Sequence, residues 1–243
     1  METKVFESAA QLVTALADEL QKISECKRAV HVALSGGSTP TLWFEFLAAS
    51  AFRDSIHWSH IHFWWGDERC VPPENPESNY GTASRLLFQK VNVEEENIHR
   101  IQGEEDPQVE KLRLSKELGK RLPIVNGLPQ FDWIILGVGE DGHTASLFPG
   151  QYSLNANETV VAVRHPETGQ ARLSLTAPVI ENARRVSYLA MGRAKRIIVN
   201  QILADRDPGL CSHLPAARIQ SREGETEWWL DRESALGIEG VAV

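Results

Sequence analysis

The chain of 243 residues has little cysteine and no long apolar run. Its three cysteines, Cys26, Cys70 and Cys211, are far apart and odd in number, which excludes a disulfide framework and a zinc-binding spacing. A reducing compartment is the simplest expectation for such cysteine usage. No apolar run is long enough to cross a bilayer, and the first residues lack the basic and apolar regions of a signal peptide. We therefore expect a cytoplasmic protein with no membrane partner.

Positive charge is also scarce, because 25 Lys and Arg residues stand against 33 Asp and Glu residues, a formal net charge of −8. A nucleic-acid-binding surface needs a basic face to neutralise phosphates, so this balance argues against nucleic acid as a partner. A small anionic ligand is still compatible, since two or three well-placed cations in a pocket suffice to hold one. The histidines outside residues 137–143 lack a metal-ligand spacing such as H-x-x-x-H. We expect neither a metal nor a cofactor.

Apolar segments alternate with amphipathic ones along the chain. Continuously apolar runs predict strands, and amphipathic runs predict helices, the latter at 5–23, 78–88, 107–122 and 192–203. The strands are expected at 29–34, 61–65, 131–136, 186–191 and 227–230. Buried strands separated by helices indicate an α/β fold with a mainly parallel, twisted sheet and helices on both faces. Residues 160–163 and 172–176 predict a small antiparallel excursion. We expect one domain over 1–243, with a small subdomain around 155–180.

Four loops rich in polar residues follow predicted strands, at 35–39, 66–69, 137–143 and 191–195. Ligands of such folds bind beyond the carboxyl ends of the strands, so these loops should gather on one rim.

The first loop, SGGSTP, combines Gly36 and Gly37 with a helix that we expect to begin with Ser38 or Thr39 as its N-cap. Glycines let backbone N–H groups approach an anion, and a helix N-terminus favours negative charge. The loop therefore suggests a phosphate cradle, and a tight capped turn is the alternative.

The third loop, GVGEDGHTASLF, holds the candidate general base, His143, at an expected helix start. Histidine is the side chain best suited to exchange protons near neutral pH, and Asp141 is close enough to orient it. A capping Asp beside a surface His is the alternative interpretation.

The other two loops carry further charge. The second places Asp67 and Arg69 directly after a strand. The alternative to a binding role is a solvent-exposed loop. The fourth places Lys195, between Arg193 and Arg196, at the start of a helix. Cations there oppose the helix dipole, so an anionic ligand would relieve the mismatch. Arg172 could add a fork-shaped grip on the same ligand.

Taken in this order, ALSGGSTP, GDERCVPPENPESNYG, ILGVGEDGHTASLFPG and RLSLTAPVIENARRVSYLAMGRAKR resemble the 6-phosphogluconolactonase family. The resemblance runs from about Val30 to the end of the chain, and DER-x-VPP combined with GEDGHTASLFP is its most specific part. It implies the Rossmann-like fold shared with glucosamine-6-phosphate deaminases and sugar-phosphate isomerases. It also implies hydrolysis of 6-phospho-D-glucono-1,5-lactone to 6-phosphogluconate, a step of the oxidative pentose phosphate pathway, without a metal or cofactor.

Carried onto this chain, the resemblance implies a general base at His143, supported by Asp141. Arg69, with Asp67 nearby, would meet the developing negative charge or the oxygens of the substrate. The positions implied on the phosphate side are Gly36, Gly37, Ser38, Thr39, Arg172 and Lys195.

Two alternatives remain beside a lactonase. Deaminases or isomerases acting on glucosamine 6-phosphate need a further carboxylate just after the Asp-Gly-His segment, and residues 144–150, TASLFPG, contain none. A non-catalytic sugar-phosphate sensor needs the cradle but no base, so the presence of Asp141 and His143 disfavours it. The expected partner is a small phosphorylated sugar lactone, and the expected assembly is a monomer or a weak homo-oligomer.

Overall fold

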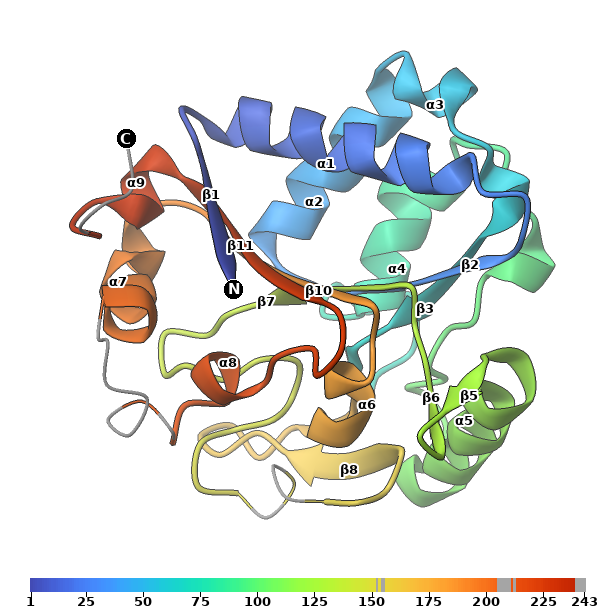
Figure 1. Cartoon of the computed structure of the whole chain (residues 1–243). Coiled ribbons are helices and arrows are strands. Elements are labelled where there is room, and N and C mark those ends of the chain that lie inside the picture. The colour runs from blue at the N-terminus through green and yellow to red at the C-terminus, as the bar shows by residue number, and fades with distance from the viewer. Residues whose placement is uncertain (152, 154–155, 205–210, 212, 239–243) are drawn as a thin grey trace.

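The computed structural model describes residues 1–151, 153, 156–204, 211 and 213–238, and its centre is a six-stranded sheet (Figure 1). All strand pairs in this sheet are parallel, in the order β1-β11-β10-β7-β2-β3. The six strands are β1 (Glu2–Phe6), β2 (Val30–Leu34), β3 (Ile61–Trp65), β7 (Trp133–Gly137), β10 (Arg185–Ala190) and β11 (Glu225–Asp231).

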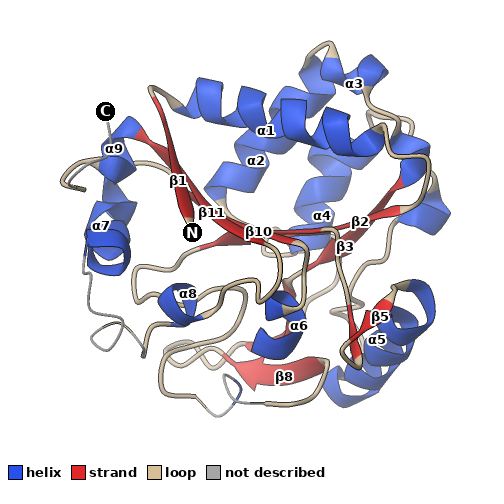
Figure 2. Ribbon diagram, viewed as in Figure 1, coloured by secondary structure: helices blue, strands red, loops and turns tan. Residues whose placement is uncertain are grey.

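Helices cover both faces of the parallel sheet (Figure 2). On one face lie α1 (Ala9–Ser24) and α2 (Ser38–Ala49), and on the other lie α6 (Ala177–Glu181) and α8 (Pro215–Arg218). The remaining α-helices are α3 (Phe52–Ser55), α4 (Asn79–Ala83), α5 (Pro107–Arg121), α7 (Arg196–Ala204) and α9 (Arg232–Ala235). The sheet with two helical layers confirms the predicted α/β architecture.

A second, antiparallel sheet in the order β4-β9-β8 lies beside the first. It consists of β4 (Asp67–Arg69), β8 (Val160–Arg164) and β9 (Ala171–Leu175). The predicted antiparallel excursion is therefore confirmed, and β8 and β9 form a hairpin that pairs Val160 with Leu175. A short ladder joins β5 (Ile124–Val125) to β6 (Leu128–Pro129).

The core forms because the strands are apolar on both faces and the helices bring one apolar stripe each. Every residue of β2 is buried, and in α1 the side chains of Leu12, Leu16 and Leu20, at i, i+4 spacing, are fully buried. The tryptophans of β3 and β11 are also in the core and are at most 2% exposed.

Two sequence-based predictions of local structure were wrong. The predicted helix 5–23 starts too early, because residues 2–6 form the edge strand β1 and pair with β11, more than 200 residues away. Helix α1 begins only at Ala9, after the N-cap Ser8. The predicted helix at 78–88 is confirmed, as α4 followed by one π-helical turn, Ser84–Phe88. The expected loop at Asp67–Arg69 is the strand β4, because it pairs with β9.

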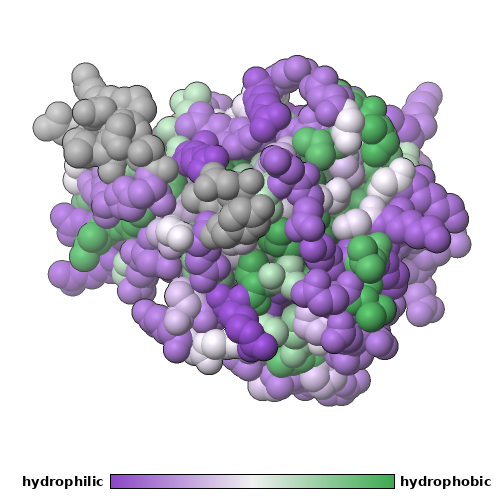
Figure 3. Space-filling view, turned by 90° about the horizontal axis from the view of Figure 1, so that it is seen from below, coloured by the Kyte–Doolittle hydropathy of each residue, from purple (hydrophilic) through white to green (hydrophobic). Residues whose placement is uncertain are grey.

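The surface seen from below is mostly hydrophilic, with hydrophobic residues in small, separate patches (Figure 3). No helix in the described part of the chain combines the length and the apolar character needed to span a bilayer.

Candidate functional site

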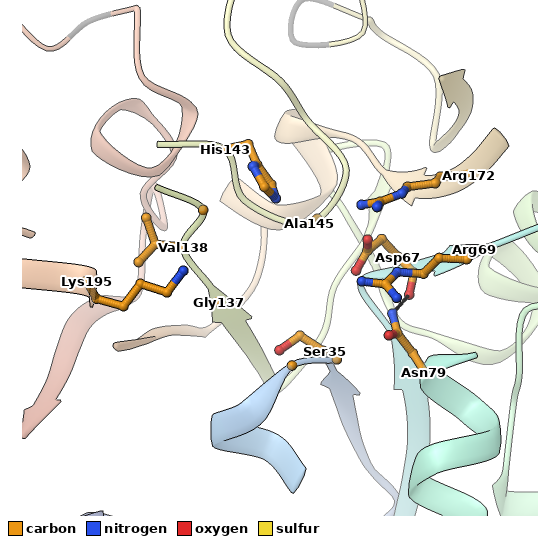
Figure 4. Close-up of a pocket in the computed structure, with 13 residues that line it drawn as sticks. Ser35, Asp67, Arg69, Asn79, Gly137, Val138, His143, Ala145, Arg172 and Lys195 are labelled. Atoms are coloured by element: carbon orange, nitrogen blue, oxygen red, sulfur yellow. Dashed lines mark hydrogen bonds between the residues drawn. The ribbon is translucent and has the colours of Figure 1, made fainter. Parts of the chain in front are cut away.

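A cavity of about 240 Å³ opens where the chain leaves the carboxyl ends of β2, β3, β7 and β10 (Figure 4). All four polar loops singled out in the sequence contribute to it. The lining residues are Ser35, Gly36, Gly37, Asp67, Arg69, Asn79, Gly137, Val138, Gly139, His143, Ala145, Arg172 and Lys195. The structure thus brings the Gly-rich loop and His143 into one cavity, as the rule for parallel α/β sheets predicts.

Some predicted site residues lie outside this lining. Asp141 is hydrogen-bonded to His143 but does not line the cavity, and Ser38 and Thr39 lie in the first turn of α2. Of the two arginines that flank Lys195, Arg196 donates from Nε to the carbonyl of Leu236 at 2.9 Å and so faces the C-terminal segment.

His143 and Asp141 form a hydrogen-bonded pair at the cavity wall. The Asp141 Oδ1 atom is 2.5 Å from His143 Nδ1 and 3.1 Å from the backbone nitrogen of His143. Because a carboxylate can only accept, Nδ1 carries the proton of this hydrogen bond, and Nε2 is the unprotonated nitrogen in the neutral form of the ring. Figure 4 shows the ring pointing into the cavity. Burial would raise the pKa of Asp141, but the charge of His143 and its hydrogen bonds outweigh this and lower it.

The loop that carries this pair is built from turns, so the predicted helix start at His143 is wrong. Gly142 has φ +81°, and Ala145, a cavity-lining residue, has φ +49°; both values interrupt a right-handed helix. Gly139 is required for a steric reason, because a Cβ there would lie 2.1 Å from His143 Nδ1 and 2.5 Å from Asp141 Oδ1. The loop conformation therefore allows the close contact between Asp141 and His143 and does not start a helix.

The Gly-rich loop leads directly into α2. Gly37 is the N-cap, with φ +107°, and neither Ser38 nor Thr39 caps the helix, so the predicted N-cap was wrong. The φ value explains why, since a residue with a side chain rarely adopts it. No side chain caps this N-terminus, which leaves its backbone N–H groups available to an anion. Gly36 is held against Asn79, whose Oδ1 atom would lie 1.9 Å from an added Cβ.

Strand β4 holds the acidic and basic residues of the second loop in fixed positions. The buried carboxylate of Glu68 accepts hydrogen bonds from the backbone nitrogens of Arg69, Asn79 and Tyr80, each at 2.8 Å. Burial raises the pKa of Glu68, although these bonds oppose the shift. Asp67 is also buried and accepts from the hydroxyl of Ser146 at 2.6 Å. Glu68 thus anchors β4 to the start of α4.

Two arginines stand side by side on one wall, because Arg69 of β4 pairs with Arg172 of β9. Arg69 donates from Nη1 to the carbonyl of Glu77 at 2.8 Å, while its buried Nε atom has no hydrogen-bond partner in the described part of the chain. Burial, and then the charge of Arg69, lower the pKa of Arg172. Two adjacent, partly desolvated guanidinium groups make a strong site for an anion.

Lys195 provides positive charge on the other side of the cavity (Figure 4). It belongs to a 3₁₀ turn, Arg193–Lys195, that follows Gly192 at φ +82°. Both carboxylate oxygens of Asp231 accept from the backbone nitrogen of Gly192 at 3.0 Å, and the same side chain caps α9. These hydrogen bonds of Asp231 hold in place the loop that carries Lys195.

Sequence reasoning missed Asn79 and Ala145, which lie outside the four predicted loops, and assigned no role to Ser35, which lies in the first loop. Asn79 had a weak signal, because it follows Ser78 at a helix start, yet its contact with Gly36 bridges two distant segments. Ser35 is a polar residue directly after an apolar strand, and this position in the sequence indicates the ligand-binding edge of the sheet.

Metal-ligating and thiol chemistry have little support in the described structure. Among the described residues, no three His, Cys, Asp or Glu side chains are grouped to hold a metal ion. Burial raises the pKa of Cys70 to about 11, so this group is a thiol, not a nucleophilic thiolate, at neutral pH.

The sequence profile of one protein family, described as "Glucosamine-6-phosphate isomerases/6-phosphogluconolactonase", matches residues 4–228. The chain belongs to this family. A 6-phosphogluconolactonase of Haemophilus influenzae is 47% identical to it over 227 residues, which cover 93% of this chain and 95% of the relative. A 6-phosphogluconolactonase of Treponema pallidum is 35% identical, with 92% of each chain covered.

Solved structures agree with the membership in the glucosamine-6-phosphate isomerase/6-phosphogluconolactonase family. A crystal structure named devB protein is 48% identical, with a TM-score of 0.92, and the match covers 96% of this chain and 98% of that one. A 6-phosphogluconolactonase from Thermotoga maritima is 26% identical, with a TM-score of 0.80 and coverage of 95% and 99%. A monomeric glucosamine-6-phosphate deaminase, at 19% identity and a TM-score of 0.79, shares the fold.

Proposed function

We propose that the chain hydrolyses 6-phospho-D-glucono-1,5-lactone to 6-phospho-D-gluconate, with His143 as general base. The observation that carries the proposal is the Asp141–His143 pair, whose imidazole faces a cavity that also holds three cationic side chains. The relative from Haemophilus influenzae, named 6-phosphogluconolactonase at 47% identity, supports the same reaction.

His143 acts in two proton transfers. With Nδ1–H held by Asp141, the free Nε2 takes a proton from a water molecule, which attacks the C1 carbonyl of the lactone. Nε2 then returns the proton to the ring oxygen as the C1–O bond breaks. General acid–base catalysis of this kind accounts for about 10²–10⁴ in rate.

The cations and the Gly-rich loop bind the anionic parts of the substrate. Arg69, Arg172 and Lys195 supply the positive charge for the phosphate dianion and for the oxyanion that develops at C1. Gly36 and Gly37 bring the uncapped N-terminus of α2 to the phosphate side. Binding the remote phosphate holds C1 in place, so that binding energy serves orientation.

A deaminase or isomerase is the weaker candidate. Among the cavity-lining residues, Asp67 is the single carboxylate, and residues 144–150 add none. The further carboxylate that the deaminase reaction needs for ring opening is therefore missing from the lining. Ammonia release from glucosamine 6-phosphate would contradict this reasoning, and binding of 6-phosphogluconate without turnover of the lactone would favour a sensor instead.

The proposal is tested with lactone generated in situ by glucose-6-phosphate dehydrogenase, measuring acceleration over spontaneous hydrolysis. His143→Ala should keep its circular dichroism spectrum and lose about 10²-fold or more in kcat. His165→Ala is the matched control, since both rings pack against Phe148, with centroids at 4.7 and 5.0 Å, yet His165 does not line the cavity. Retained kcat in His143→Ala would reject the assignment of the base.

A further inference from the structure

Ser35 is a buried hydroxyl with no partner. It is 5% exposed, it lines the cavity directly after β2, and its Oγ atom has no hydrogen bond to any described residue. Figure 4 shows the side chain at the floor of the cavity, between the walls formed by Lys195 and by the two arginines.

Leaving such a group unpaired is costly, about 1–3 kcal/mol for a buried donor or acceptor. Other buried serines near the cavity avoid this cost. The hydroxyl of Ser146 donates to Asp67 at 2.6 Å, and that of Ser174 donates to the carbonyl of Leu175 at 2.9 Å. Ser35 therefore differs from its neighbours in having its hydrogen-bonding capacity left for a molecule in the cavity.

The chemistry of the site restricts what that molecule offers to Ser35. The cations and the helix N-terminus supply donors for anionic oxygens, whereas a hydroxyl both donates and accepts. The absence of a hydrogen bond from Ser35 to His143 leaves the serine without the base that a nucleophile requires. A neutral ring hydroxyl, which also donates and accepts, is the matching partner.

We propose that Ser35 is a specificity residue that exchanges a hydrogen bond with one hydroxyl of the sugar-lactone ring. This rests on the proposed function, and it adds a contact to the ring between the phosphate and the carbonyl. Ser35 then discriminates against lactones that lack this hydroxyl, because its own buried hydroxyl would stay unpaired in their complexes.

The test combines one variant with a series of substrates: the 6-phospholactone and its 2-, 3- and 4-deoxy analogues. Ser35→Ala should lower kcat/KM for the parent lactone about tenfold, the effect of one neutral hydrogen bond. For one of the analogues, the wild type should lose a similar factor, and Ser35→Ala should cause no further loss. Ser35→Thr, which keeps a hydroxyl, should keep the discrimination.

Ser153→Ala is the matched control, because Ser153 is also buried, its hydroxyl has no partner among the described residues, and it does not line this cavity. It should leave kcat/KM unchanged for all four lactones. Equal losses on every lactone in Ser35→Ala, or no loss, would overturn the proposal. A failure of Ser35→Ala to fold would also overturn it, because removing a buried hydroxyl without a partner should not destabilise the fold. A wild type that fails to accelerate lactone hydrolysis would instead reject the proposed function itself.

Discussion

Replacing Gly139 by alanine perturbs the proposed catalytic pair, Asp141 and His143, without substituting either residue. The backbone of Gly139 is outside the left-handed region, so alanine is compatible with its conformation. The added Cβ would lie 2.1 Å from His143 Nδ1, 2.3 Å from its Cε1 and 2.5 Å from Asp141 Oδ1. The only way to accept the methyl group is to move the ring and the carboxylate.

The size of that movement sets the expected effect. Ordinary van der Waals contact begins at 3.4 Å, so the imidazole has to retreat by roughly 1.3 Å from its place. A displacement of about 1 Å in a catalytic group can cost about 10² in rate. We therefore expect Gly139→Ala to lower kcat about 10²-fold, while the free energy of unfolding changes by about 1 kcal/mol or less.

Gly137→Ala is the matched comparison, measured in the same lactone assay. Gly137 lines the same cavity and also avoids positive φ, but an added Cβ there meets no atom within 4 Å. Its kcat should stay within a few-fold of the wild type, and any effect of the methyl group should appear in KM. If both variants kept full kcat, or lost it equally, the pair would not be the sterically constrained catalytic unit described above.

The remaining predictions concern protonation and stability. Asp141→Asn should lower kcat on the order of 10²–10⁴-fold in the same assay, because the amide no longer selects the Nδ1–H tautomer; an unchanged kcat would contradict the role of Asp141. Burial lowers the pKa of His31 from 6.5 to about 4. As the pH falls, His31 is therefore protonated in the unfolded chain before it is protonated in the folded protein. The free energy of unfolding should be unchanged above pH 6.5 and should fall by about 3 kcal/mol towards pH 4. Urea titrations should show this fall in the wild type and a smaller fall in His31→Gln, in which His62, whose pKa burial also lowers, still titrates; an equal fall in the variant would exclude His31 as a source. Glu68→Ala should lower the free energy of unfolding by about 3 kcal/mol, because three backbone N–H groups lose their acceptor, and a urea midpoint equal to the wild type would refute this.

Much of the site could be predicted because its signals are local. A continuously apolar run that ends in glycine marks both a parallel strand and its ligand-binding end, as in β2 followed by Gly36 and Gly37. The Asp141–His143 pair is equally local, since its two members are separated by one residue. The start of helix α5 is also marked by local sequence, because Asp106 caps the helix and Pro107 is its first residue.

Contacts between distant segments decided the rest. Residues 2–6 are a strand because β11 supplies their backbone partners, and Asp67–Arg69 are a strand because β9 does. Asn79 meets Gly36 across more than 40 residues of sequence, and the hydroxyl of Ser35 has no hydrogen-bond partner among the described residues. The amino-acid sequence by itself determined which strand-end loops would surround the cavity, because apolar periodicity and glycine act over a few residues. Only the tertiary structure decided which polar atoms are already paired and which are left for a ligand, since burial and hydrogen bonding depend on segments that local sequence does not relate.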